Sequence, residues 1–162
     1  MLTSINKILY ATDLDTGMRP ALRMAMSLAD KYQSQVTLLY VIEPVSQSVY
    51  HWQSEDFWQE IRGKTQQASV ELSEEYLSRF FEEEGLRDKV ARPQVVIKHG
   101  HIADTVLRTA DDIDVDLIVM GTHSHTALGK LILGSVTDKV IRTSSRPVLL
   151  VPITADADKN TD

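Results

Sequence analysis

The sequence predicts an α/β fold built on a doubly wound, five-stranded parallel sheet. Two observations carry this prediction: five short apolar runs are rich in β-branched residues, and longer segments with apolar residues at helical spacing separate them. A helix between two buried strands is a βαβ unit with a right-handed crossover, so the strands run parallel. Ligands of such folds bind outside the carboxyl ends of strands, where the strand order reverses. The loops after residues 11, 41 and 120 are therefore the first places to search for a site.

The first part of the chain shows a strand, a helix and a second strand. Residues 5–11 form the first apolar run, a helix is predicted over residues 17–33, and residues 36–42 form the second run. The predicted core face of this helix consists of Leu22, Ala25, Met26, Leu28, Ala29 and Tyr32.

A long helix is predicted next, over residues 55–84, with Gly85 as its stop. Apolar residues recur along one of its faces, and we expect this face to lie on the sheet. Its members are Phe57, Ile61, Ala68, Leu72, Tyr76 and Phe80.

The second half of the chain repeats the alternation. Strands are predicted over residues 94–98, 116–120 and 148–152, with one helix spanning residues 102–113 and another starting after Gly134. The alternation of five strands with four helices completes the doubly wound pattern.

Composition limits the possible partners. The net charge of −6 argues against nonspecific binding to nucleic acid, and no apolar run is long enough for a membrane span. The absence of cysteine excludes thiolate metal sites and cysteine nucleophiles, and it suits a reducing cytoplasm. We expect a cytoplasmic protein with a single domain over residues 1–153 and a disordered polar tail over residues 154–162.

Residues 116–144 combine a strand, a loop that contains Gly121, Gly129 and Gly134, and a helix that Ser135 opens. Free backbone N–H groups and the dipole of a helix N-terminus both favour an anion, so the stretch suggests a nucleotide site. It is not a P-loop, because seven residues separate Gly121 from Gly129, where that motif needs four.

With these motifs the chain resembles the ATP-binding branch of the universal stress protein family. The family signature is Gly, two residues, Gly, nine residues, and Gly followed by Ser or Thr; here Gly121, Ser124 and Gly134-Ser135 occupy that frame. The strand ends Ala-Thr-Asp and Tyr-Val-Ile and the closing Arg-Pro-Val-Leu-Leu-Val-Pro are also similar. The resemblance implies a Rossmann-like universal stress protein fold with strand order 3-2-1-4-5 and two helices on each face.

The resemblance also implies an ATP site, with ADP or AMP as other ligands and with Mg²⁺ on the phosphates as an option. Asp13 would contact the ribose and Val41 would present its backbone to the adenine, while the glycines and the helix start would hold the phosphates. No catalytic residue is expected. The expected binding residues are Ala11, Thr12, Asp13, Val41, Met120, Gly121, His123, Ser124, Gly134, Ser135, Val136 and Thr137.

Two residues depart from the family pattern. Ser124 replaces the middle glycine, and Ala11 replaces the proline often found before Thr-Asp. If the glycine is needed for positive φ, Ser124 costs about 1 kcal/mol of backbone strain. We expect this change to weaken ATP binding rather than abolish it.

Three functions stay open. The first is an ATP-binding regulatory module in the stress response, a homodimer through the last strand, from Val148 to Val151, whose nucleotide state an unknown protein partner reads. The second is a weak ATPase or a nucleotide-dependent enzyme on the same fold. The third is a nucleotide-free dimeric stress protein in which Ser124 closes the site.

Two His-x-His pairs, His99/His101 and His123/His125, suit Zn or Ni in extended backbone. No acidic or histidine partner stands beside them at a recognised spacing, so no metal site is expected. We expect His123 to lie beside a phosphate of the ligand instead.

Overall fold

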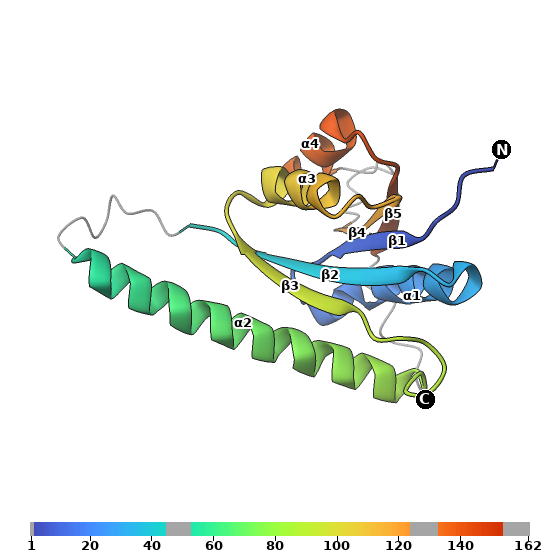
Figure 1. Ribbon diagram of the computed structural model, residues 1–162, viewed down its shortest axis with the longest axis horizontal. Coiled ribbons are helices and arrows are strands. Elements are labelled where there is room, and N and C mark those ends of the chain that lie inside the picture. The colour runs from blue at the N-terminus through green and yellow to red at the C-terminus, as the bar shows by residue number, and fades with distance from the viewer. Residues whose placement is uncertain (1, 45–52, 124–132, 154–162) are drawn as a thin grey trace.

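The computed structural model describes residues 2–44, 53–123 and 133–153, and it contains the predicted α/β sandwich (Figure 1). In the described part, the strands are β1 (Lys7–Ala11), β2 (Gln35–Ile42), β3 (Gln94–His99), β4 (Leu117–His123) and β5 (Val148–Ile153). All neighbours pair in parallel in the order β3-β2-β1-β4-β5. The predicted order is confirmed, and it reverses between β1 and β4.

Helices cover both faces of this sheet. A short 3₁₀ turn, η1 (Thr16–Met18), leads into α1 (Arg19–Tyr32), and α2 (Glu55–Glu83), α3 (Ile102–Asp112) and α4 (Ser135–Thr143) follow. Figure 1 shows α1 and α2 on one face and α3 and α4 on the other. The expectation of two helices on each face is confirmed.

The pleat of β1 divides the core into two halves. Ile8 and Tyr10 point toward α1 and α2, whereas Leu9 and Ala11 point toward α3 and α4. All four are at most 8% exposed. Because both faces of the central strand are covered, its sequence is a continuous apolar run rather than an alternating one.

The first helix begins differently from the prediction. Asp15 caps η1, its Oδ1 accepting the N–H of Gly17 at 3.0 Å, and the α-helix starts only at Arg19. The helix ends at Tyr32, and its C-cap Gln33 adopts the left-handed conformation with a φ of 56°. Tyr32, expected in the core, is 48% exposed, although its spacing places it on the buried face; it is the last residue of the helix.

The fourth strand is longer than predicted. It continues beyond Met120, and its last three residues pair with Val151, Pro152 and Ile153 of β5. Gly121 therefore lies in a strand and not in a loop, although glycine inside a strand usually weakens it. A Cβ at Gly121 would overlap the Met18 sulfur and lie 3.2 Å from Ile153 Cγ1, so any larger residue here would force both side chains to shift.

The predicted core face of α2 is wrong over most of its length. Tyr76 and Phe80 are buried as expected, but the four preceding members of that face, Phe57, Ile61, Ala68 and Leu72, are exposed. The helix instead buries Ser69, Ser73, Tyr76, Leu77, Phe80 and Phe81.

Serine explains the error in α2. The hydroxyls of Ser69 and Ser73 donate to the carbonyls of Thr65 and Ser69 at 2.7 and 2.8 Å. Two small side chains with satisfied polar groups can therefore lie in the interior, which an apolar pattern does not anticipate. The stop at Gly85 agrees with the prediction, since this glycine has a φ of 62°.

None of the helices described is long and apolar enough to cross a bilayer. The expected tail, residues 154–162, lies outside the described residues, and the single-domain boundary stays a prediction.

Candidate functional site

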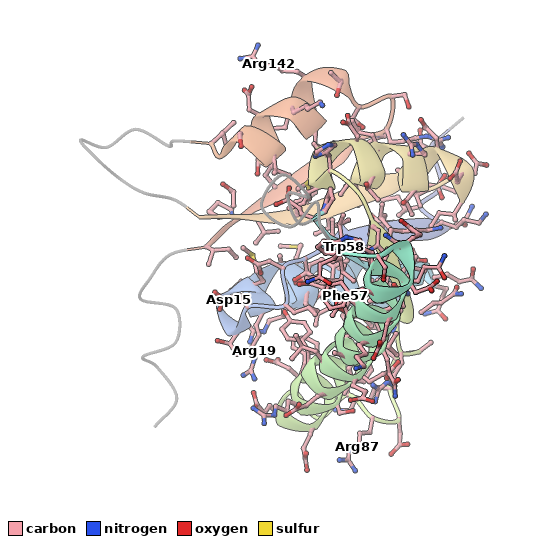
Figure 2. The ribbon with its side chains drawn as sticks, turned by 90° about the vertical axis from the view of Figure 1, so that its left-hand side faces the viewer. Asp15, Arg19, Phe57, Trp58, Arg87 and Arg142 are labelled. Carbon is pink, nitrogen blue, oxygen red and sulfur yellow. The ribbon has the colours of Figure 1, made fainter. Side chains whose placement is uncertain are left out.

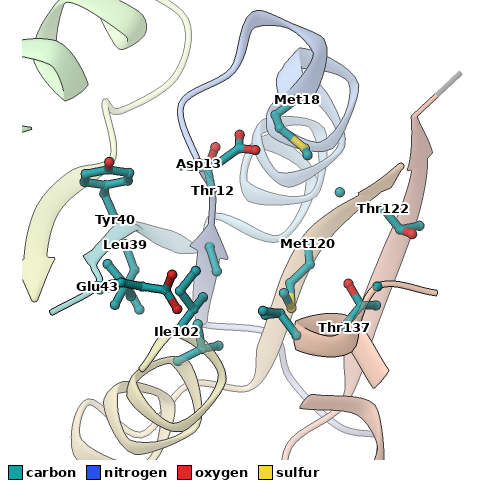
Figure 3. Close-up of a pocket in the computed structure, with 16 residues that line it drawn as sticks. Thr12, Asp13, Met18, Leu39, Tyr40, Glu43, Ile102, Met120, Thr122 and Thr137 are labelled. Carbon is teal, nitrogen blue, oxygen red and sulfur yellow. The ribbon is translucent and has the colours of Figure 1, made fainter. Parts of the chain in front are cut away.

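A pocket of about 670 Å³ lies at the carboxyl ends of β1, β2 and β4, where the strand order reverses. Its volume falls within the range of roughly 300–1,000 Å³ that is usual for small-molecule sites. Figure 3 shows Asp13 and Glu43 on one side and Thr122 and Thr137 on the other. The lining residues are Ala11, Thr12, Asp13, Met18, Leu39, Tyr40, Val41, Glu43, Ile102, Val106, Met120, Gly121, Thr122, Gly134, Val136 and Thr137.

Most of the expected binding residues meet in this pocket: Ala11, Thr12, Asp13, Val41, Met120, Gly121, Gly134, Val136 and Thr137. Ser135 starts α4 but is not part of the lining. Ser124 and the side chain of His123 lie outside the described residues. Contact of these residues with a ligand stays a prediction.

The sequence prediction missed the other lining residues: Met18, Leu39, Tyr40, Glu43, Ile102, Val106 and Thr122. Some of them had a detectable signal, because Leu39 and Tyr40 belong to the strand that contains Val41, and Thr122 adjoins Gly121. Ile102 and Val106 come from α3, and only the three-dimensional fold brings them under β2 and β4.

Hydrogen bonds hold the loop after β1 in position. The Thr12 N–H donates to the Leu39 carbonyl at 3.1 Å, and the Thr12 Oγ1 accepts the N–H of Leu14 at 3.0 Å. One carboxylate oxygen of Asp13 accepts the N–H of Asp15 at 2.9 Å. Leu14 has a φ of 63°, a conformation that non-glycine residues rarely adopt. These contacts direct Asp13 to the pocket.

The N-terminus of α4 forms the opposite wall. Gly134 is its N-cap, with extended backbone and no side-chain hydrogen bond, and the Asp138 N–H makes the first bond of the helix, to the Gly134 carbonyl at 2.9 Å. Helix geometry leaves the N–H groups of residues 135–137 without intrahelical acceptors. Such groups, together with the helix dipole, attract an anion.

Thr122 contributes a buried hydroxyl to the same wall. The residue is 3% exposed, and its Oγ1 has no hydrogen-bond partner within the described part of the chain. A buried polar group without a partner costs about 1–3 kcal/mol. A ligand that hydrogen-bonds to this hydroxyl would remove that penalty.

The charges in the described lining are negative only. Asp13 and Glu43 supply carboxylates, and none of the lining residues is Lys, Arg or His. Attraction of a phosphate in this part of the site therefore depends on backbone N–H groups. A divalent cation bound to a polyphosphate would reduce the repulsion between the phosphates and these two carboxylates.

A pair of buried tyrosines supports the β1 side of the pocket. The Tyr10 hydroxyl donates to the Met18 carbonyl at 3.2 Å and lies 3.2 Å from the Tyr76 hydroxyl. Because Tyr10 has one hydroxyl hydrogen, Tyr76 is the donor between the two rings. Burial raises the pKa of Tyr10 well above its usual value and also raises the pKa of Tyr76, so both stay neutral.

The histidine pairs are not brought together among the residues described. His99 ends β3, and its Nε2 lies 3.0 Å from Gln66 Oε1 on α2. β2 and β1 stand between β3 and β4. No group of three metal-binding side chains occurs within residues 2–44, 53–123 and 133–153.

Comparisons with known proteins agree on one family. A family model described as the universal stress protein family matches residues 4–152. The universal stress protein MJ0577 of Methanocaldococcus jannaschii is 29% identical over 164 residues, covering 93% of this chain and 97% of that protein. Its solved structure superposes with a TM-score of 0.63 over 93% of this chain and 97% of that chain.

Two other solved structures share the fold and contain nucleotides. One is a universal stress protein in complex with cAMP, 17% identical, with a TM-score of 0.62 over 93% of this chain and 99% of that chain. The other is a universal stress protein from Archaeoglobus fulgidus in complex with dAMP, 18% identical, with a TM-score of 0.58 over 91% of this chain and 98% of that chain. At these identities the likeness concerns the fold.

Proposed function

The chain belongs to the universal stress protein family, and on that basis we propose that its pocket binds an adenine nucleotide, with ATP as the ligand. One observation carries the proposal: a pocket of about 670 Å³ is lined by Asp13, by a helix N-terminus without a side-chain cap, and by Thr122, whose buried hydroxyl has no partner in the described structure. The complexes of relatives with cAMP and dAMP support an adenine ligand.

The two ends of the pocket suit different parts of a nucleotide. Leu39, Ile102 and Val106 are apolar and line the pocket together with Val41, which suits a base held by the main chain of β2. Asp13 keeps one carboxylate oxygen for the ribose hydroxyls, because the other accepts the Asp15 N–H. The phosphates then extend to the N-terminus of α4.

Mg²⁺ is part of the proposal for ATP. The described lining holds two carboxylates and no cationic side chain, so an uncomplexed triphosphate would meet repulsion there. A cation on the phosphates would offset that repulsion. We expect ATP to bind more tightly with Mg²⁺ than without it.

We also propose that the protein is a cytoplasmic homodimer whose nucleotide state a protein partner reads. β5 is an edge strand of the sheet, and its residues Val148 to Val151 are half-buried on both faces. An edge of this kind is usually covered, and an antiparallel pairing of two copies of β5 would cover it.

The experiment for the nucleotide is mass spectrometry of small molecules released by denaturing freshly purified protein, combined with thermal denaturation in added Mg-ATP. We expect an adenine nucleotide in the released fraction. At 100 times the dissociation constant, ATP should stabilise the fold by about 2.7 kcal/mol. Protein that releases no nucleotide and shows no thermal shift would support the nucleotide-free interpretation.

A further inference from the structure

The exposed face of α2 is an apolar stripe that the nucleotide site does not use. It consists of Phe57, Ile61, Ala68 and Leu72, and we keep the name α2 stripe for these four residues. Phe57, Ile61 and Leu72 are 38%, 36% and 50% exposed, and Ala68 is exposed as well. At about 100° per residue, the four side chains lie within about 60° of one another around the helix.

The stripe lies on a part of α2 that has little support. The buried residues of α2 begin at Ser69, and within residues 55–68 only Trp58, Thr65 and Gln66 are even half-buried, Gln66 lying beside His99 of β3. Figure 1 shows this half of the helix extending past the sheet, and Figure 2 shows Phe57 and Trp58 near its end. Gly63, inside this half, lowers helix propensity by roughly 1 kcal/mol. A helical segment as short as residues 55–68 is marginally stable without tertiary contacts, so a partner packed on the stripe would stabilise this segment.

The spacing of the stripe is symmetric. The intervals between its members are four, seven and four residues, so its midpoint falls between Lys64 and Thr65. A twofold axis at that midpoint, with two helices antiparallel, places Phe57 level with Leu72 of a second copy and Ile61 level with Ala68. Self-complementarity of this kind is what an isologous interface requires.

The spacing of the stripe, and not its charge, selects a second copy. Glu55 and Glu60 are paired within the helix, with Arg62 at 2.7 Å and Lys64 at 2.6 Å, while Asp56 and Glu71 add two further carboxylates on this segment. The repulsion between the carboxylates of two copies is screened by salt at this exposed surface, so it weakens the association without preventing it.

We infer that the α2 stripe is a self-association surface, through which two copies of this chain pack their α2 helices antiparallel. The stripe is about 22 Å long and one helix face wide, which is well below the roughly 800 Å² per partner of a stable interface. Association through it is therefore weak and depends on concentration. It does not use β5 or the pocket.

Thiol cross-linking tests the geometry. The chain contains no cysteine, so Lys64→Cys introduces one reactive thiol next to the predicted twofold axis. Val70→Cys is the matched control, because Val70 is 39% exposed on the same helix but lies about 170° around from the stripe. We expect a short bismaleimide to form the covalent dimer at least ten times faster with Lys64→Cys than with Val70→Cys. Equal rates would overturn the inference.

Sedimentation equilibrium tests the energetics at hundreds of micromolar protein. We expect the weight-average mass of wild type to rise with concentration, that of Ile61→Asp to rise clearly less, and that of Val70→Asp to follow wild type, whether or not β5 also pairs. Leu72→Asp should repeat the effect of Ile61→Asp, with circular dichroism confirming that each variant is folded. If wild-type protein and Ile61→Asp have the same weight-average mass at every concentration, self-association through the α2 stripe is refuted. Nucleotide titration of Ile61→Asp tests the pocket separately, and we expect unchanged affinity.

Discussion

Gly121→Ala and Gly134→Ala each add one methyl group to the same pocket, and we expect opposite consequences. The two glycines belong to one motif in the sequence, but they differ in surroundings. A Cβ at Gly121 would overlap the Met18 sulfur and lie 3.2 and 3.3 Å from two Ile153 carbons. A Cβ at Gly134 would have no atom within 4 Å in the described structure.

The magnitude for Gly121→Ala follows from packing. Met18 borders the pocket and would have to shift toward it, whereas Ile153 is 6% exposed and its two carbons would have to yield within the core. Overpacking of this kind costs about 1–3 kcal/mol. For a chain of this length, that corresponds to a Tm lower by about 2–12 °C without nucleotide.

Gly134→Ala should change the apo protein little. Gly134 has a φ of −66°, which alanine adopts readily, and alanine as an N-cap costs at most about 1 kcal/mol relative to glycine. If phosphates lie against the start of α4, the methyl group obstructs them, and we expect ATP to bind at least ten-fold more weakly, or about 1.4 kcal/mol.

Differential scanning calorimetry without nucleotide and isothermal titration with Mg-ATP measure the two effects separately. A Gly121→Ala protein as stable as wild type would refute the packing role of this glycine. Unchanged ATP affinity in Gly134→Ala would refute the placement of the phosphates at α4.

Three more predictions concern single hydrogen-bonding groups. Thr122→Val removes a buried hydroxyl that has no partner in the described structure, so the Tm of the apo protein should stay unchanged or rise. The same change should weaken ATP binding in calorimetric titration. A lower Tm of the apo protein would contradict the first expectation. Tyr10→Phe should lose about 1–3 kcal/mol in urea denaturation, because the buried carbonyl of Met18 and a tyrosine hydroxyl on α2 lose their partner; an unchanged midpoint would count against it. The hydrogen bond from Arg146 lowers the pKa of Asp114, so the stability that Arg146→Gln removes should be larger at pH 7 than at a pH below the lowered pKa of Asp114. The part that comes from the hydrogen bond to the Val115 carbonyl should stay at both pH values. Thermal denaturation at pH 7 and well below about pH 4 measures this, and a constant Tm difference would oppose it.

Most of the fold was predictable because local patterns and long-range packing agree in the sheet. Continuous apolar runs identified the strands, and helical spacing in α1 placed Leu22, Ala25, Met26 and Ala29 in the core. The prediction failed for α2, where buried serines replace apolar contacts and the helix extends past the sheet. A periodic pattern marks apolar residues, but it does not say whether another element is there to cover them.

The candidate site was predictable where one motif or one strand end supplies the residues. Asp13, Val41 and Gly134 all line the pocket, and their contact with a nucleotide stays a prediction. The role of Gly121 was harder to predict, because its close contact is with Met18, more than a hundred residues earlier in the chain. Ser124, on which the expected loss of affinity depends, lies outside the described residues.

The central claim is that this pocket binds an adenine nucleotide, and calorimetric titration of nucleotide-stripped protein with Mg-ATP tests it most directly. We predict one nucleotide bound per chain, and affinity reduced at least ten-fold in Asp13→Ala, which removes the carboxylate proposed for the ribose. Two results together would contradict the claim: Mg-ATP gives no binding heat with wild-type protein, and neither ADP nor AMP displaces a fluorescent adenine nucleotide from it.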